Sequence, residues 1–299
     1  MAERYAPAPI RFGTADGLML RGERWGRGRA TLTFVHGAGL TVSAYRAAFA
    51  GLGSRASVHA LNARGHGASD VPRTFAGYGR PVLDLRAFAE TLPKPVILAG
   101  HSYGALLSLR LAAEAPGLAA GLLLLEPLIP WRRGGGWKPA GEGPDGPLIE
   151  ATRGRRESWP SLGEARAWLR ARGVYRGWTE RCLADFMETG VRGQQDGTVA
   201  LACPPWLEAE VYLGRPGEET FEWAARAGLP AVIVRGAQST HCVPEGAEDL
   251  AHAFGLGSVL TVKGGHTFPM EHPEETGRVL EMALDMLGRG MIANAYGPR

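Results

Sequence analysis

The sequence has no long apolar run and few cysteines, and each shortage excludes a class of protein. A transmembrane helix needs about 20 mostly apolar residues; no such stretch occurs, so we expect no stable membrane insertion. The cysteines (Cys182, Cys203 and Cys242) form no CxxC pair, so we expect free thiols in a reducing compartment. The first residues show no apolar segment followed by a cleavage site, so we expect no secretory signal and a cytoplasmic location.

Lysine is also scarce, whereas glycine is abundant. Lys94, Lys138 and Lys263 are the only lysines, so arginine dominates the 33 cationic residues, which face 30 Asp and Glu for a net charge of +3. The cations are not gathered in one tract, so we expect no nucleic-acid partner. Glycine occupies 43 of 299 positions, about twice its usual share of about 7%. A short glycine motif is therefore weak evidence without its structural context.

Short apolar segments alternate with helical patterns along most of the chain. After an N-terminal hairpin at 10–25, the expected strands are 31–36, 57–62, 95–99, 120–125, 231–235 and 258–262. The expected helices are 43–51, 82–92, 103–115, 244–254 and 273–287. This alternation predicts an α/β fold with a mostly parallel sheet and helices on both faces.

The alternation stops between residues 127 and 228. A segment rich in Gly and Pro is followed by helical patterns near 161–172 and 179–189, and no strand of the core type occurs. We expect a helical cap domain at 127–228, inserted into one core made of 1–126 and 229–299. Seven of the eight tryptophans lie in this insertion.

A nucleophile motif lies between an expected strand and an expected helix. Residues 100–104 read GHSYG and match G-x-S-x-G, with the strand PVILA before them and a strongly helical segment after them. The flanking glycines permit the strained turn that exposes a serine hydroxyl at the edge of a sheet. We therefore expect Ser102 to be a nucleophile.

A serine nucleophile needs a base, and four histidines follow it in the sequence. His266 comes directly after the expected strand VLTV, at the sheet edge where sites form in open α/β folds. His252 falls within a helix, His272 precedes a proline at a helix start, and His241 is the remaining candidate. We expect His266 to be the base.

The carboxylate that orients the base is harder to place. The segment after the strand AVIVR contains no carboxylate until Glu245, and Ser239 stands where an acid is expected. Glu126 ends the apolar strand GLLLLE, and a carboxylate buried there needs a polar partner. We expect Glu126 to complete the triad, with Glu245 as the alternative.

Backbone N–H groups near the nucleophile are the expected oxyanion donors. The loop HGAG at 36–39 follows the first buried strand, and Tyr103 follows the nucleophile. We expect the N–H groups of Ala38 and Tyr103 to stabilise the negative charge on a carbonyl oxygen.

With these motifs in place, the chain resembles an α/β-hydrolase-fold serine hydrolase of the esterase or lipase kind over nearly its whole length. The resemblance rests on four blocks: HGAG at 36–39, NARGHGAS at 62–69, GHSYG at 100–104 and GGHTFPMEHPEE at 264–275. In a subset of that superfamily the acid follows the earlier strand, as Glu126 does here. By resemblance, Arg64 to Ser69 is a structural loop near the site.

The insertion would then form a lid over the pocket. Trp131, Trp159 and Trp206 are candidates for an apolar acyl-binding wall, although each tryptophan can equally pack inside the cap. Residues 127–181 carry eleven Arg and Lys against six Asp and Glu, whereas 182–228 carry three against eight. The basic run at Arg153, Arg155 and Arg156 can attract an anionic substrate, but a solvated, internally paired face is the simpler interpretation.

We therefore expect an enzyme that cleaves carboxylic esters of small to medium apolar acyl groups through an acyl-enzyme. The same triad can act on a C–C bond, a lactone, an amide or a thioester. A non-catalytic small-ligand receptor on this fold is the alternative from another class. We expect a small-molecule acyl substrate and neither a metal nor an organic cofactor.

Overall fold

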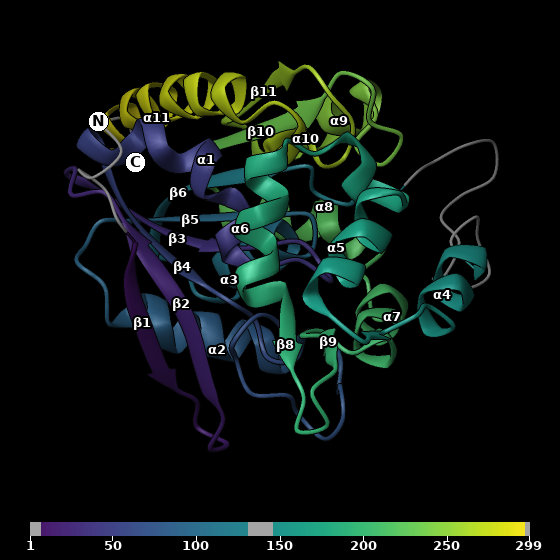
Figure 1. The fold of residues 1–299 in the computed structure, drawn as a ribbon. Helices are drawn as coiled ribbons and strands as arrows, with labels where there is room; N and C mark the ends of the chain where they lie inside the picture. The colour runs from purple at the N-terminus through teal and green to yellow at the C-terminus, as the bar shows by residue number, and fades with distance from the viewer. Residues whose placement is uncertain (1–6, 131–145, 297–299) are drawn as a thin grey trace.

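A single eight-stranded sheet organises the computed structural model, which describes residues 7–130 and 146–296. The spatial order of its strands is β1 (Ala8–Gly13), β2 (Met19–Trp25), β4 (Ala56–Leu61), β3 (Ala30–Val35), β5 (Val96–His101), β6 (Ala119–Leu125), β10 (Ala231–Gly236) and β11 (Gly257–Val262). β1, β2 and β4 pair antiparallel, and every pair from β4 to β11 is parallel. The α/β fold predicted from the sequence is confirmed (Figure 1).

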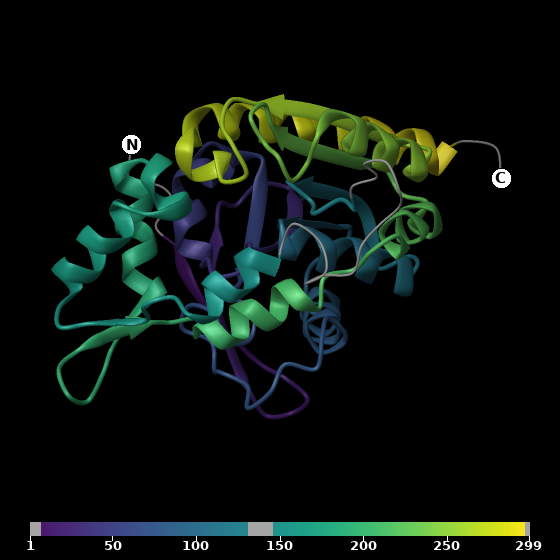
Figure 2. The same cartoon turned by 90° about the vertical axis from the view of Figure 1, so that its right-hand side faces the viewer.

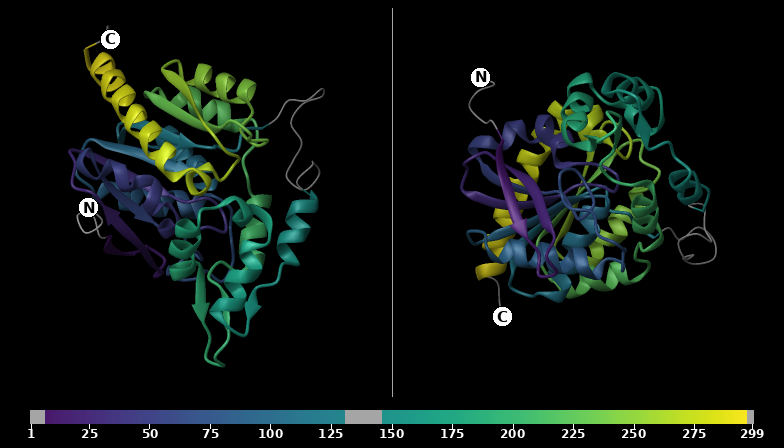
Figure 3. Two further views of the ribbon diagram at one scale, coloured as in Figure 1. Left: turned by 45° about the horizontal axis from the view of Figure 1, so that its top comes forward. Right: turned by 60° about the horizontal axis from the view of Figure 1, so that its bottom comes forward.

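Two apolar clusters cover the two faces of this sheet. The first face packs against α2 (Gly79–Glu90), α3 (Tyr103–Glu114), α8 (Glu219–Ala227) and α9 (Pro244–Phe254). The opposite face packs against α1 (Arg46–Phe49) and the long α11 (Pro273–Tyr296), which extends across the sheet in Figure 3. The central strands β5 and β6 are buried on both sides, as parallel strands between two helical layers must be.

The prediction of one continuous helix at 43–51 is wrong. The segment forms three short pieces, η2 (Val42–Tyr45), α1 and η3 (Ala50–Ser54), and the first and last are 3-10 helices. Glycines at 51 and 53 favour this interruption, because glycine is a poor helix former. The final helix, in contrast, continues beyond the expected end at 287.

The inserted segment lies together at one side of the core (Figure 2). Its elements are α4 (Gly146–Arg153), β7 (Ser158–Trp159), α5 (Leu162–Arg170), η4 (Gly173–Gly177), α6 (Glu180–Gly190), β8 (Val191–Gly193), β9 (Val199–Leu201) and α7 (Pro205–Leu213). The antiparallel sheet β7-β9-β8 was not expected. Its strands have two or three residues, too few for the alternation that indicates a strand in sequence.

Helix α8 lies within the expected cap range but packs with the core. Ala224 and Ala227 are buried among core residues of α3 and α9. We therefore infer that the boundary between cap and core precedes α8, ahead of the one expected at 228. α6 packs instead against η2 and α1, so apolar packing is continuous from the cap into one layer of the core.

Candidate active site

Ser102 occupies a tight turn between β5 and α3. Its backbone is strained, with φ 53° and ψ −114°. A Cβ on Gly100 would approach the Gly104 carbonyl oxygen to 2.2 Å, and one on Gly104 would approach the Val35 carbonyl oxygen to 2.0 Å. Neither position accommodates a larger residue without a backbone shift. The GHSYG motif therefore lies in the strand–turn–helix context that a nucleophile elbow requires.

His266 lies in the turn after β11 and contacts both other members of the expected triad. Its Nε2 is 3.0 Å from Ser102 Oγ, and its Nδ1 is 2.9 Å from Glu126 Oε2. Burial lowers the pKa of the His266 imidazole to about 4, so the ring is neutral near pH 7. With Nδ1–H donated to the carboxylate, Nε2 accepts a proton from the serine hydroxyl.

Glu126 directly follows β6, has a positive φ of 47° and is completely buried. One carboxylate oxygen accepts the N–H of Gly236 at 2.5 Å, and the other accepts the hydroxyl of Ser239 at 2.5 Å as well as the His266 ring. Burial raises the pKa of Glu126, and the bonds from Ser239 and Gly236 oppose that rise. Ser239, at the position where an acid was expected, thus holds the carboxylate that arrives from β6.

The alternative candidates lie elsewhere. Glu245 is exposed in the first turn of α9, and His252 is exposed near the end of the same helix. His272 follows the short α10 (Phe268–Glu271). His241 is closer, because its ring centroid lies 4.6 Å from that of His266.

The expected oxyanion donors flank the nucleophile. Ala38 borders the same cavity as Ser102. Tyr103 is the first residue of α3, where a helix makes no use of the backbone N–H. Gly39 in the same loop has a φ of 70°, and its N–H donates to His66 Nε2 at 3.1 Å, which fixes the loop from behind.

A buried polar chain joins the 36–39 loop to the His266 backbone. The N–H of Gly37 donates to Tyr45 Oη at 3.1 Å, and Tyr45 Oη lies 2.7 Å from His101 Nδ1. His101 Nε2 lies 2.8 Å from the carbonyl oxygen of His266. Because a carbonyl only accepts, His101 donates from Nε2 and accepts the tyrosine hydroxyl at Nδ1. Sequence reasoning missed the roles of Tyr45 and His101 in this chain, although His101 lies inside the nucleophile motif.

A cavity of about 360 Å³ opens onto Ser102 and His266. Its core side is lined by residues 37–40, His101, Ser102, Leu128, His241, His266 and Thr267, and its cap side by Leu148, Ala151, Thr152, Arg155, Trp168, residues 172–175, Glu208, Tyr212 and Arg215. The lining surface is mostly apolar, as is common for small-molecule sites.

The tryptophans expected at the cavity wall are placed differently. Trp159 is buried inside the cap, with its ring 5.4 Å from that of Trp168. Trp206 is 39% exposed on α7. Neither borders the cavity, whereas Trp168 does. Trp131 lies outside the described residues.

A family comparison accounts for this arrangement. The sequence model of the alpha/beta hydrolase family matches residues 34–279. The chain belongs to the alpha/beta hydrolase family. This membership confirms the superfamily resemblance seen in the sequence and supports hydrolase activity.

A curated relative matches one part of this chain. A type I acyl-CoA thioesterase, mpaH, from Penicillium roqueforti (strain FM164) is 37% identical over 105 residues, which are 34% of this chain and 22% of that protein. The chain thus matches about a fifth of that relative's length.

Two solved structures share the fold across nearly the whole chain. E-2-(acetamidomethylene)succinate hydrolase has a TM-score of 0.78 and 21% identity, covering 94% of this chain and 100% of that one. A thioesterase domain from the curacin biosynthetic pathway has a TM-score of 0.75 and 18% identity, covering 93% and 99%.

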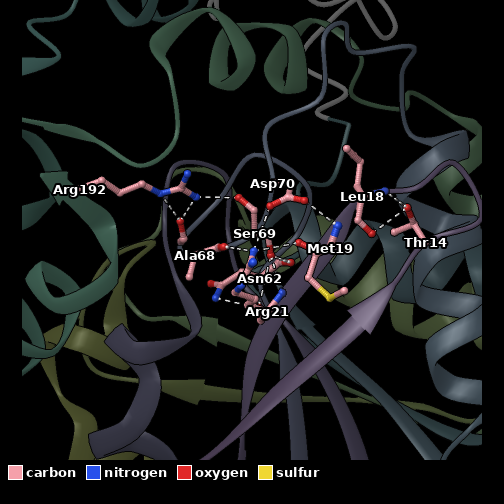
Figure 4. A network of polar contacts seen from close by, with 10 residues as sticks. Thr14, Leu18, Met19, Arg21, Asn62, Ala68, Ser69, Asp70 and Arg192 are labelled. Atoms are coloured by element: carbon pink, nitrogen blue, oxygen red, sulfur yellow. Dashed lines mark hydrogen bonds and ion pairs between the residues drawn. The ribbon is translucent and has the colours of Figure 1, made fainter. Parts of the chain in front are cut away.

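The 62–70 loop is a structural support in this hydrolase. Arg64 binds the carboxylates of Asp84 and Asp16 from a buried position. Figure 4 shows the neighbouring network, in which Arg192 of β8 donates to the carbonyl oxygens of Gly67 and, at 2.7 Å, of Ser69. β8 of the inserted segment is therefore bonded directly to the 62–70 loop.

Within residues 7–130 and 146–296, no group of three or more His, Cys, Asp or Glu is arranged to hold a metal ion. No helix in these ranges is both long and apolar enough to cross a membrane. Cys182, Cys203 and Cys242 are buried and unpaired with one another.

Proposed function

We propose that this chain is a serine hydrolase that cleaves carboxylic esters of small to medium acyl groups. The observation that carries the proposal is the continuous hydrogen-bonded series from Ser102 through His266 to Glu126, at 3.0 and 2.9 Å. A serine hydroxyl becomes a competent nucleophile when a neutral imidazole accepts its proton, and a buried carboxylate stabilises the imidazolium that results.

The proposed reaction proceeds in two halves. Ser102 Oγ attacks the acyl carbon while its proton moves to His266 Nε2, and the N–H groups of Ala38 and Tyr103 stabilise the oxyanion. The imidazolium then protonates the departing alcohol, which leaves an acyl-serine. Water, deprotonated by His266, attacks that ester, and the acid departs as Ser102 regains its proton.

Thioesters are a second candidate substrate class. The sequence relative that matches a third of the chain is an acyl-CoA thioesterase, and a thioesterase domain shares the fold. The same acyl-enzyme chemistry serves both substrates, because a thiolate leaves from the tetrahedral intermediate as an alcohol does.

The test combines covalent labelling with turnover. Wild-type protein should react with a fluorophosphonate probe at Ser102 and hydrolyse 4-nitrophenyl esters. Ser102→Ala should do neither while keeping its circular dichroism spectrum and melting temperature. Retained turnover in Ser102→Ala would overturn the assignment, and an unlabelled, inactive wild type would favour the non-catalytic receptor. Matched acyl esters and acyl-CoA thioesters, compared by kcat/KM, decide between the two substrate classes.

A further inference from the structure

The charged groups that line the cavity are mostly cations. Arg155, Arg172 and Arg215 border it, and Glu208 is the single carboxylate among its described lining residues. Glu208 is buried and already engaged, because it binds the Arg155 guanidinium and accepts the Tyr212 hydroxyl at 3.0 Å. Arg172 therefore contributes a positive charge to a mostly apolar cavity.

Arg172 is the cation best placed to meet a ligand. Its guanidinium lies 4.7 Å from the centroid of the Trp168 ring, and Nη1 lies 3.4 Å from the Trp168 carbonyl oxygen. Within the described ranges no carboxylate is paired with it. The aromatic face restricts the guanidinium, while its planar donors can still bind an anion in bidentate fashion.

The surroundings of Arg172 locate it at the cavity mouth. Leu148 and Val174 both line the cavity, yet 46% of each is exposed. Arg172, which is itself exposed and also lines the cavity, lies where the cavity meets solvent.

The basic run expected to attract anions is otherwise occupied. Arg153 binds Glu150 and Glu210, and Arg155 binds Glu208. Arg156 donates to the Ser158 carbonyl oxygen and lies over the Trp159 ring. The paired interpretation of that run agrees with these contacts, and the cavity cation comes from further along the chain.

We propose that the substrate is an acyl compound whose chain ends in an anionic group, a carboxylate or a phosphate, held at the cavity mouth by Arg172. This inference rests on the proposed function, because it places the acyl carbon at Ser102. A charge-assisted bond to a guanidinium adds affinity that a methyl-ended chain lacks.

The experiment compares substrates that differ only at the far end of the chain. We would measure kcat/KM for 4-nitrophenyl hexanoate, for the mono-4-nitrophenyl ester of adipic acid, and for 4-nitrophenyl 6-phosphooxyhexanoate. The variants are Arg172→Gln and Arg172→Lys. The matched control is Arg176→Gln, because Arg176 is an exposed arginine of η4 that donates to the Ala171 carbonyl oxygen and does not border the cavity.

The wild type should prefer an anionic ester over the neutral one by about tenfold or more. Arg172→Gln should remove most of that preference, mainly by raising KM for the anionic esters. Arg172→Lys should retain part of it, and Arg176→Gln all of it. Whichever anionic ester is preferred identifies carboxylate or phosphate as the end group.

Two results would overturn the inference alone: equal turnover of all three esters by the wild type, or a preference that Arg172→Gln and Arg176→Gln alter equally. The proposed function would still stand, because Ser102-dependent cleavage would remain. If no ester or thioester is cleaved and Ser102 is not labelled, the proposed function itself is wrong.

Discussion

The sheet core and the inserted segment contribute different things to the cavity. Every group proposed to do chemistry lies in the core, directly after β3, β5, β6 or β11, whereas more than half of the cavity-lining residues come from the insertion. All eight histidines also lie in the core, and the range 127–228 has none. We therefore propose that the strand ends set the reaction, while the insertion selects what reaches it.

Acid should destabilise the core more than any single substitution below. Burial lowers the pKa of His66 and His266 to about 4 and of His101 to about 3, and it also lowers that of His36. The unfolded chain binds protons near the ordinary value of 6.5, so the free energy of unfolding falls as pH drops from about 6.5 to about 4. Each unit is worth about 1.4 kcal/mol per imidazole, and native domains have only about 5–15 kcal/mol to lose.

Denaturant midpoints measured at pH 7, 5.5 and 4.5 test this expectation. Glu126, whose pKa burial raises, opposes the trend at the acid end. His66→Gln should flatten the dependence of the unfolding free energy on pH, because it removes one of these imidazoles. If the free energy of unfolding stays constant between pH 7 and 5, the buried histidines do not make the core sensitive to acid, and this contrast between core and insertion fails.

Glu126→Gln should have the next largest effect. A glutamine has one oxygen, which can still accept the Gly236 N–H, but its NH₂ group cannot accept the Ser239 hydroxyl or the His266 ring N–H. It also cannot stabilise the His266 imidazolium, so kcat should fall by about 10³- to 10⁴-fold. Substrate preference should not change, because selection is assigned to the insertion. The measurement is kcat and KM across the ester panel, with Glu245→Gln as the control. If Glu245→Gln is the variant that loses activity, the acid has been misplaced.

The strand ends were predictable because burial and chemistry coincide there. β5, β6 and β10 consist almost entirely of apolar residues, so the ends of these strands are visible in sequence. Ser102 directly follows β5, Glu126 directly follows β6, and His266 lies in the turn after β11. Parallel strands bring all such ends to one edge. Glu126 was predicted as the acid because a carboxylate that closes an apolar run requires a partner.

The cavity wall was not predictable on the same grounds. Trp159, Trp168 and Trp206 look alike in sequence, yet one is buried, one borders the cavity and one is exposed. Their positions depend on how short helices and two- to three-residue strands pack, which no local pattern encodes. Tyr45 likewise reaches His101 across 56 residues of sequence, so its role depends on tertiary structure.

Trp159→Ala and Trp206→Ala compare a buried and an exposed tryptophan within the insertion itself. Removing a completely buried indole leaves a void, and such changes cost about 3–5 kcal/mol of stability. The matched Trp206→Ala, at an exposed position of α7, should cost within about 0.5 kcal/mol. Thermal and denaturant unfolding measure both. Neither change should alter chain-end discrimination; a shift in discrimination in Trp206→Ala, but not in Trp168→Ala, would restore Trp206 to the cavity wall.

Tyr45→Phe should produce the smallest of these effects, and it tests whether the core acts as one rigid unit. The change removes a hydroxyl that accepts from the Gly37 N–H and donates to His101, and it leaves both partners buried. The oxyanion loop and the His266 backbone then lose a common anchor, so kcat should fall by about tenfold while KM and the Arg172-dependent preference persist. A matched variant, Tyr175→Phe, removes a hydroxyl from a buried tyrosine of the cap and should leave kcat near the wild-type value. Tyr45→Phe could instead raise KM for anionic and neutral esters alike and leave kcat intact. In that case the hydrogen-bonded chain from Gly37 to His266 contributes to substrate binding rather than to catalytic alignment. The core would then share in substrate selection, which is assigned above to the insertion alone.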